Sequence, residues 1–202
     1  MSDAPIVVKL GGSLAGSPLL RPWLRAIEAE AASVVIVPGG GPFADAVRAA
    51  QPVMGFDNRA AHVMALMAMA QYAVALASLG TTMVAATNVA AIEQALVRER
   101  VPVWSPWPML GDAPDVAESW DVTSDSLALW LAMRLQARRV VIVKHRAPIG
   151  ASARQLVVDG IVDAAFPRFL AGFPGVVTLA AVADSPAAAL AADNGFTTIA
   201  VA

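Results

Sequence analysis

The chain opens with Ile6-Val7-Val8-Lys9-Leu10-Gly11-Gly12-Ser13, and this stretch decides the fold. Apolar residues, two of them β-branched valines, surround one lysine and lead into a pair of glycines. The pattern predicts a buried strand that runs into a loop whose backbone can approach a ligand closely. A lysine at the end of such a strand is poorly placed for solvent. It is well placed to meet a phosphate group.

The same arrangement recurs where Val34-Val35-Ile36-Val37 leads into Pro38-Gly39-Gly40-Gly41. Each glycine costs about 0.5–1 kcal/mol of backbone entropy relative to alanine, so consecutive glycines indicate a place where bare backbone is needed. The two glycine loops supply backbone N–H donors suited to an anion. Neither loop fits the Walker pattern or the dinucleotide-binding fingerprint.

Short apolar runs alternate with helical patterns along the rest of the chain. The expected strands are 6–10, 34–37, 82–86, 101–104, 140–143, 176–179 and 197–201. The expected helices are 18–32, 43–50, 59–79, 88–98, 124–137, 167–171 and 186–192, with an ordered loop at 105–120 and a mixture of strand and turn at 155–163. Because the strands are too apolar to be half exposed, we expect an α/β three-layer αβα sandwich with a mainly parallel central sheet, formed by one domain over residues 1–202.

The composition points to extensive buried surface, since 57% of the 202 residues are hydrophobic and only 15% are charged. Residues 59–79 are apolar nearly all round, so we expect this helix to be covered on more than one side and to form a homodimer. The alternative for residues 60–79 is a membrane span. It is disfavoured because the segment contains His62, Gln71 and Ser78 and is built mostly from alanine and methionine.

The net charge of −2 provides no field that would attract nucleic acid or an anionic membrane. The absence of cysteine excludes disulfides, thiolate metal sites and cysteine nucleophiles. The first residues lack a basic stretch followed by an apolar core, so the expected location is the cytoplasm.

Lysine is scarce: the chain has only Lys9 and Lys144, against twelve arginines. Each lysine ends an expected buried strand, and ligands bind at that edge of an open parallel sheet. Two lysines that converge there can neutralise the charge of transferring phosphates. The alternative is a lysine whose apolar stem lies against the protein while its ammonium group reaches solvent. This alternative is stronger for Lys144 than for Lys9.

Three runs, 8–13, 37–44 and 120–128, occur in the order found in one known family. Together they resemble the amino acid kinase superfamily, which includes acetylglutamate, aspartate, uridylate and isopentenyl phosphate kinases. The resemblance covers residues 5–143. Residues 61–69 and the run Trp120-Asp121-Val122-Thr123-Ser124-Asp125-Ser126 are most similar to the small kinases of methanofuran biosynthesis, which convert an aminomethylfuran-methyl phosphate to its diphosphate.

The resemblance implies a role for each matching residue. Lys9 would contact the transferring phosphoryl group, and Asp125 would orient the catalytic lysines. Lys144 follows the matched residues, and it is the candidate to substitute for the second lysine of relatives; the alternative is an altered nucleotide site. The residues implied at the nucleotide phosphates are Gly11, Gly12, Ser13 and Lys144. The residues implied at the acceptor are Gly40, Gly41, His62 and Thr123. The resemblance also implies ATP and Mg²⁺, with the ion held mainly by nucleotide oxygens and no protein metal site.

Ordinary structural explanations stand beside these roles. His62 can be a satisfied polar group on a buried helix, and Asp125 can be a first-turn carboxylate favoured by the helix dipole. Three tryptophans near the third motif, and two methionines near His62, offer walls for an apolar or aromatic acceptor; the alternative is ordinary packing. These residues are Trp104, Trp107, Trp120, Met64 and Met67.

The resemblance weakens after residue 143. Relatives commonly carry an acidic Asp-x-Asp-Gly-like segment there, whereas this chain has Lys144-His145-Arg146-Ala147-Pro148-Ile149-Gly150 and no further lysine. We expect an acceptor-binding N-terminal half and, from about residue 120, a shortened nucleotide-binding half.

The expected function is an ATP-dependent kinase that converts a small phosphate monoester to a diphosphate. Such an acceptor has a second pKa of about 6 and needs no general base at neutral pH. Two alternatives stay open. One is a catalytically inactive kinase-fold protein that binds an anionic metabolite or serves as a subunit of a complex. The other is a kinase with a carboxylate acceptor.

Overall fold

The computed structural model describes residues 4–111, 113–148, 150–191 and 197–199. These residues form a seven-stranded sheet in the order β3-β4-β2-β1-β5-β6-β7. The strands are β1 Ile6–Leu10, β2 Val34–Pro38, β3 Met83–Ala86, β4 Val101–Trp104, β5 Arg139–Lys144, β6 Val176–Ala181 and β7 Thr197–Thr198. Strands β1 to β6 pair in parallel and β7 runs antiparallel to β6, which confirms the expected mainly parallel sheet.

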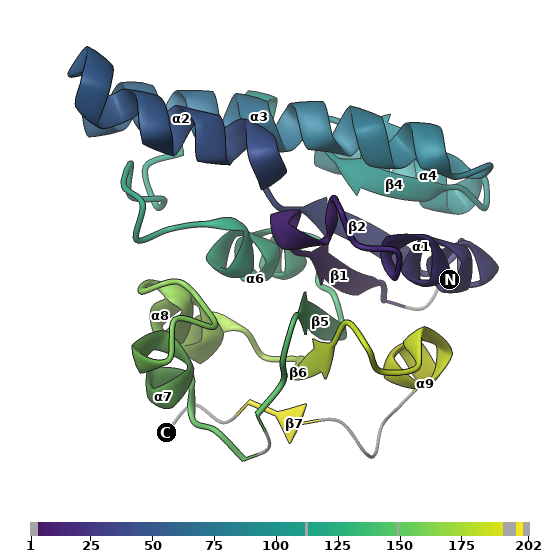
Figure 1. The fold of residues 1–202 in the computed structure, drawn as a ribbon. Coiled ribbons are helices and arrows are strands. Elements are labelled where there is room, and N and C mark those ends of the chain that lie inside the picture. The colour runs from purple at the N-terminus through teal and green to yellow at the C-terminus, as the bar shows by residue number, and fades with distance from the viewer. Residues whose placement is uncertain (1–3, 112, 149, 192–196, 200–202) are drawn as a thin grey trace.

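Helices cover both faces of this sheet. They are α1 Leu20–Ala29, α2 Gly41–Met54, α3 Asn58–Leu79, α4 Val89–Val97, α5 Trp107–Leu110, α6 Ser124–Arg134, α7 Ala153–Val158, α8 Phe166–Gly172 and α9 Pro186–Ala191, with a 3-10 turn η1 at Gly12–Leu14. Figure 1 shows α6, α7 and α8 on one side of the sheet and α1 and α9 on the other, with α2 and α3 side by side. This is the expected αβα sandwich.

The central strand β1 divides two apolar cores. Val7 packs with α6 and α8, whereas Ile6, Val8 and Leu10 pack with α1 and α9. Since side chains alternate along a strand, Lys9 lies on the same face as Val7 and points toward α6. The alternation therefore directs the one charged side chain of β1 toward the first turn of that helix.

Helix α3 contributes to both cores, through Leu66 and Met69 on one side and Tyr72, Ala73 and Leu76 on the other. The Asp57 carboxylate accepts a 2.8 Å hydrogen bond from the Ala60 N–H and so fixes the helix start. By length and composition alone the helix is apolar enough to cross a membrane, although 44% of its most apolar window is buried inside the protein.

Three expected elements differ in the structure. The helix expected at 43–50 runs from Gly41 to Met54, and the loop expected at 105–120 contains the short helix α5. The mixture of strand and turn expected at 155–163 is wrong for its first part, which is helix α7. This helix forms because the Ser152 hydroxyl accepts a 3.3 Å hydrogen bond from the Gln155 N–H, while Ala153 and Leu156 are buried one turn apart. The end of the last expected strand, 200–201, lies outside the described residues.

Candidate active site

Asp125 bridges the two lysines of the chain. One carboxylate oxygen, Oδ1, lies 2.9 Å from Lys9 Nζ, and the other, Oδ2, accepts a 2.7 Å hydrogen bond from Lys144 Nζ. The two lysines approach each other because β1 and β5 are adjacent parallel strands, in which Lys9 pairs with Ile142, two residues before Lys144. The carboxylate comes from the first turn of α6, which packs against β1.

The electrostatics of this cluster follow from its burial. Burial lowers the pKa of Lys9 from 10.5 to about 8, and the neighbouring Lys144 charge also lowers it, while Asp125 opposes both effects. For Asp125, burial alone would raise the pKa, but the two lysines outweigh it and hold the pKa below its usual value. With both lysines charged, the cluster carries a net positive charge at the carboxyl edge of the sheet, where it can neutralise phosphoryl oxygens.

The two glycine loops pack directly against each other beside this cluster. A Cβ on Gly12 would lie 2.1 Å from the Gly41 backbone nitrogen, and one on Gly39 would lie 2.3 Å from the Gly12 nitrogen. Gly41 has a φ of +56°, in the left-handed region. These positions do need glycine, as expected. For Gly12 and Gly39, however, the close contact between the two loops is reason enough, without a ligand.

Gly11 lies next to the lysine cluster. A Cβ at this position would lie 3.2 Å from Lys9 Nζ, closer than an ordinary van der Waals contact. The glycine therefore leaves the room that the Lys9 ammonium occupies. The following turn, η1, carries Gly12 and Ser13 into the pocket described next.

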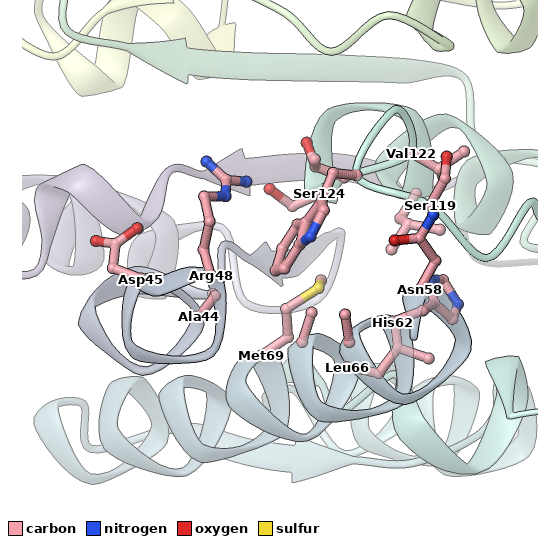
Figure 2. A pocket seen from close by; sticks show the side chains of 18 of the residues that line it. Ala44, Asp45, Arg48, Asn58, His62, Leu66, Met69, Ser119, Val122 and Ser124 are labelled. Carbon is pink, nitrogen blue, oxygen red and sulfur yellow. The ribbon is translucent and has the colours of Figure 1, made fainter. Parts of the chain in front are cut away.

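A pocket of about 250 Å³ opens between the glycine loops, α2, α3 and the start of α6. Figure 2 shows His62, Leu66 and Met69 extending from α3 toward Val122 and Ser124. The remaining lining residues are Gly12, Ser13, Gly40, Gly41, Ala44, Asp45, Arg48, Asn58, Ala61, Ala65, Ser119, Trp120, Thr123 and Leu127. The pocket thus combines an apolar floor on α3 with backbone and polar groups from both glycine loops.

His62 is the buried polar group of this floor. His62 is 7% exposed, and its Nε2 atom has no hydrogen-bond partner among the residues that the structure describes. Burial lowers the pKa of His62, and Glu118 only partly opposes this effect. A buried polar atom without a partner costs free energy, so Nε2 is available to a group in the pocket. A bound ligand would satisfy it.

Trp120 forms a wall of the pocket and is held from two directions. Its Nε1–H donates a 2.7 Å hydrogen bond to Gln51 Oε1, and the Arg48 guanidinium lies 4.5 Å from its ring centroid. The other tryptophans of the sequence prediction do not line this pocket: Trp104 stacks on Trp130 in the core with ring centroids 5.9 Å apart, and Trp107 packs against the same core. For Trp104 the packing explanation holds, whereas Trp107 also lines a separate pocket beside Val63.

The two methionines expected near the acceptor are also outside the pocket. Met64 and Met67 line a separate shallow groove with α2, whereas Met69 reaches the pocket. The helical period explains the difference, since Leu66 and Met69 stand four and seven residues after His62 and share its face. The expectation for Met64 and Met67 is therefore wrong.

Sequence reasoning missed Asp163, which lies between α7 and α8. Its carboxylate accepts hydrogen bonds from the N–H and hydroxyl groups of Thr123 and Ser126, at the start of α6. Its partners lie 37 and 40 residues away, and no local pattern around Asp163 indicates them. Thr123 stands at the N-cap of α6, but its side chain caps no helix N–H and its hydroxyl donates to Asp163 instead.

The comparisons with known proteins assign this arrangement to a class. Residues 4–95 match the model of the amino acid kinase family. A curated relative, the [5-(aminomethyl)furan-3-yl]methyl phosphate kinase of Methanocaldococcus jannaschii, is 30% identical over 159 residues, which cover 78% of this chain and 68% of the relative. The protein is a kinase, and it belongs to the amino acid kinase family.

Solved structures share the fold. The uridylate kinase of Archaeoglobus fulgidus superposes with a TM-score of 0.73 at 18% identity, over 97% of this chain and 100% of that chain. The UMP kinase of Ureaplasma parvum superposes with a TM-score of 0.68 at 15% identity, over 96% of this chain and 98% of that chain. At these identities the two structures show the architecture only.

Proposed function

We propose that this kinase transfers the terminal phosphoryl group of ATP to a small phosphate monoester and forms a diphosphate. The proposed acceptor is [5-(aminomethyl)furan-3-yl]methyl phosphate, on which the curated relative acts by its name. The observation that carries the proposal is the Lys9–Asp125–Lys144 cluster, with ammonium groups 2.9 and 2.7 Å from one buried carboxylate. Residues before about 120 would supply most of the acceptor site, and those after it the nucleotide site.

The proposed chemistry relies on positioning and charge. Lys9 and Lys144 would neutralise the charge that develops on the phosphoryl oxygens, while Asp125 keeps the two ammonium groups from moving apart. The attacking oxygen belongs to the acceptor phosphate, which has a second pKa of about 6 and is largely a dianion at neutral pH. The absence of an obvious general base among the residues that line the pocket is therefore no obstacle.

A magnesium ion would enter with the nucleotide. Among the described residues, no group of three or more His, Cys, Asp or Glu side chains is placed to hold a metal ion. Mg²⁺ keeps several waters and is commonly bound through substrate phosphates, so a site without a protein cage suits it. When bound, the ion would neutralise charge on the nucleotide phosphates.

The pocket supports a small ring as the acceptor body. Its volume of about 250 Å³ leaves room for a compact ligand only. The ring can lie against Trp120 and the Leu66 and Met69 side chains. Its phosphate would then meet His62 Nε2 and the backbone of the glycine loops, Gly40 and Gly41 included, which gives the buried histidine nitrogen a partner.

An ADP-release assay tests the proposal. The purified protein is incubated with Mg-ATP and, in turn, [5-(aminomethyl)furan-3-yl]methyl phosphate, UMP, isopentenyl phosphate or a free amino acid as a carboxylate acceptor. We expect ADP with the furan phosphate and little with the others. Hydroxylamine traps an acyl phosphate but not a diphosphate, so it separates the two products. No ADP with any phosphate monoester would refute the proposed function.

The alternative of an inactive kinase-fold protein is not favoured. The feature that would favour it is the altered segment that begins at Lys144, which lacks the acidic motif of relatives. In the structure Lys144 turns toward Asp125 rather than extending freely into solvent, and its side chain is 19% exposed. The segment therefore retains a lysine where a second catalytic lysine is needed.

We also propose that the protein is a homodimer formed through α3. Met64, Met67 and Val74 are exposed by 37%, 41% and 62%, and they follow one face of this helix at spacings of three and seven residues. Beside them, Phe43 and Val47 of α2 extend the apolar surface into a groove. A second copy placed face to face would bury this stripe.

Sedimentation velocity at micromolar concentration tests the dimer. The wild-type chain is expected to sediment as a dimer, and the variant with Met67→Glu and Val74→Glu as a folded monomer. Val97→Glu, which changes a valine that is 81% exposed on α4, should leave the dimer intact. A monomeric wild-type protein would contradict the proposal.

A further inference from the structure

Asp163 joins the loop between α7 and α8 to the first turn of α6. Its Oδ2 atom accepts hydrogen bonds of 3.0 Å from the Thr123 N–H, 2.9 Å from the Thr123 hydroxyl and 3.0 Å from the Ser126 N–H. Its Oδ1 atom accepts a hydrogen bond from the Ser126 hydroxyl. A backbone hydrogen bond of 2.9 Å reinforces this junction: the N–H of Ala165, two residues after Asp163, donates to the carbonyl of Asp121, two residues before Thr123.

The segment held in this way carries two parts of the site. Thr123 lines the pocket, and Asp125 lies between the two residues that donate to Asp163. Rotation of this turn about the helix axis would move the Asp125 carboxylate away from both lysines. The contacts of Asp163 therefore hold the turn from which the bridging carboxylate extends.

A purely structural cap would not need this arrangement. Thr123 stands at the N-cap, where a threonine hydroxyl commonly accepts a hydrogen bond from the helix itself. Here the Thr123 hydroxyl donates to the Asp163 carboxylate, and the Ser126 N–H donates to the same carboxylate. Burial and the charge of Asp125 raise the pKa of Asp163, so the second carboxylate is kept near the first at an electrostatic cost.

We infer that Asp163 is a positioning residue of the kinase site: it fixes the first turn of α6 so that Asp125 meets Lys9 and Lys144 together. This role follows from the kinase centre and does not depend on which acceptor the pocket takes. It also links the C-terminal half of the chain to the wall of the acceptor pocket through one side chain.

The chain contains a matched control for Asp163. The Glu28 carboxylate, near the end of α1, accepts hydrogen bonds from the N–H and hydroxyl groups of Thr81 and Thr82, at distances of 2.6 to 3.2 Å. Thr82 directly precedes β3, at the amino end of the strands and thus at the edge of the sheet opposite the lysine cluster. Glu28→Gln removes the same kind of charge from the same kind of network without altering the site.

The test uses the two lysines as reporters. Protein labelled with [ε-¹³C]lysine gives signals from Lys9 and Lys144 alone, so the Lys9 pKa can be measured by NMR without any substrate. Since Asp125 raises the Lys9 pKa against the effect of burial, Asp163→Asn is expected to lower it below the wild-type value of about 8. Glu28→Gln is expected to leave it unchanged, and Asp125→Asn to lower it most.

Turnover gives the second measurement, made with Mg-ATP and [5-(aminomethyl)furan-3-yl]methyl phosphate. Misplacement of a catalytic group by about 1 Å costs on the order of 100-fold, so kcat of Asp163→Asn should fall by about 10- to 100-fold. Ser126→Ala, which removes one of the four contacts and lies outside the pocket, should act in the same direction by a smaller factor. In an Asp125→Asn background, Asp163→Asn should cause no further loss of kcat.

Either of two results would overturn the inference. One is a Lys9 pKa in Asp163→Asn and Ser126→Ala equal to that of the wild type. The other is a loss of kcat that multiplies fully with that of Asp125→Asn, which would show that Asp163 acts independently of Asp125. If the wild-type enzyme turned over no acceptor, the proposed function would fail, but the NMR titration would still decide the role of Asp163.

Discussion

Lys144 Nζ donates a 2.7 Å hydrogen bond to Asp125 Oδ2, from the end of β5 to the first turn of α6. The same carboxylate lies 2.9 Å from Lys9, so one buried acid holds both lysines of the chain. A lysine that merely reached solvent would not make this contact. The geometry therefore favours a two-lysine centre for phosphoryl transfer, and the predictions below follow from it.

Asp125→Asn is expected to lower kcat by about 100- to 1,000-fold, because both ammonium groups lose the charge that holds them in place. Steady-state kinetics with Mg-ATP measure the loss, and circular dichroism checks the fold. Asp159→Asn is the control, since the Asp159 carboxylate accepts a local hydrogen bond from the Gln155 side chain, one helical turn away. Equal kcat values for Asp125→Asn and the wild type would contradict the role of the carboxylate.

The pH dependence of kcat/KM should fall on the alkaline side with an apparent pKa of about 8. Burial lowers the pKa of Lys9 to this value, so the free enzyme loses the Lys9 charge as the pH rises past it, whereas an ordinary lysine stays charged to 10.5. Bound nucleotide phosphates stabilise the charged lysine, so the alkaline limb of kcat should lie at higher pH. A kcat/KM profile that stays flat well above pH 8 would count against a catalytic Lys9.

His62→Ala is expected to raise the KM for the acceptor and leave the KM for ATP unchanged. A hydrogen bond to a charged group contributes about 1.5–3 kcal/mol, so the increase should be about 10- to 100-fold. His145, the other histidine, is exposed at the end of β5, and His145→Ala should leave the acceptor KM as it is. If only the KM for ATP changed, His62 would act on the nucleotide, and its proposed role at the acceptor would be contradicted.

Gly12→Ala is expected to destabilise the fold, because the new Cβ would lie 2.1 Å from the Gly41 nitrogen and backbone cannot move aside easily. Overpacking costs about 1–3 kcal/mol or more, which urea unfolding resolves as a lower midpoint. Gly16→Ala is the control, since a Cβ there meets no atom within 4 Å. If both variants unfolded at the same urea concentration, the close contact of the loops would be in doubt.

The fold was largely predictable because its signals are local. The β-branched runs of β2 and β5 mark buried strands, and Asp57 marks the start of α3. The neighbours of a strand are not local: β5 lies beside β1 although more than half the chain separates them. The helical nature of residues 153–158 was missed because periodicity cannot separate strand from helix in so short an apolar run, and its two valines favour a strand.

The candidate site also contains residues that the sequence predicts and residues that it does not. The residues that the family motifs carry, Lys9, Asp125 and His62, do meet at or beside one pocket. Asp163 could not be found, because a carboxylate that caps a distant helix has no sequence signature of its own. Met64 and Met67 stand close to His62 in sequence but not on its face, because the helical period places them at the groove beside α2.

The most direct test of the two-lysine kinase centre is a ³¹P NMR spectrum of the reaction with Mg-ATP and [5-(aminomethyl)furan-3-yl]methyl phosphate. With the wild-type enzyme, the acceptor monoester resonance should give way to the paired resonances of a diphosphate as ADP accumulates. With folded Lys144→Ala, conversion should be slower by about 100-fold or more. An unchanged monoester resonance with the wild-type enzyme, or full-rate conversion by Lys144→Ala, would contradict the account.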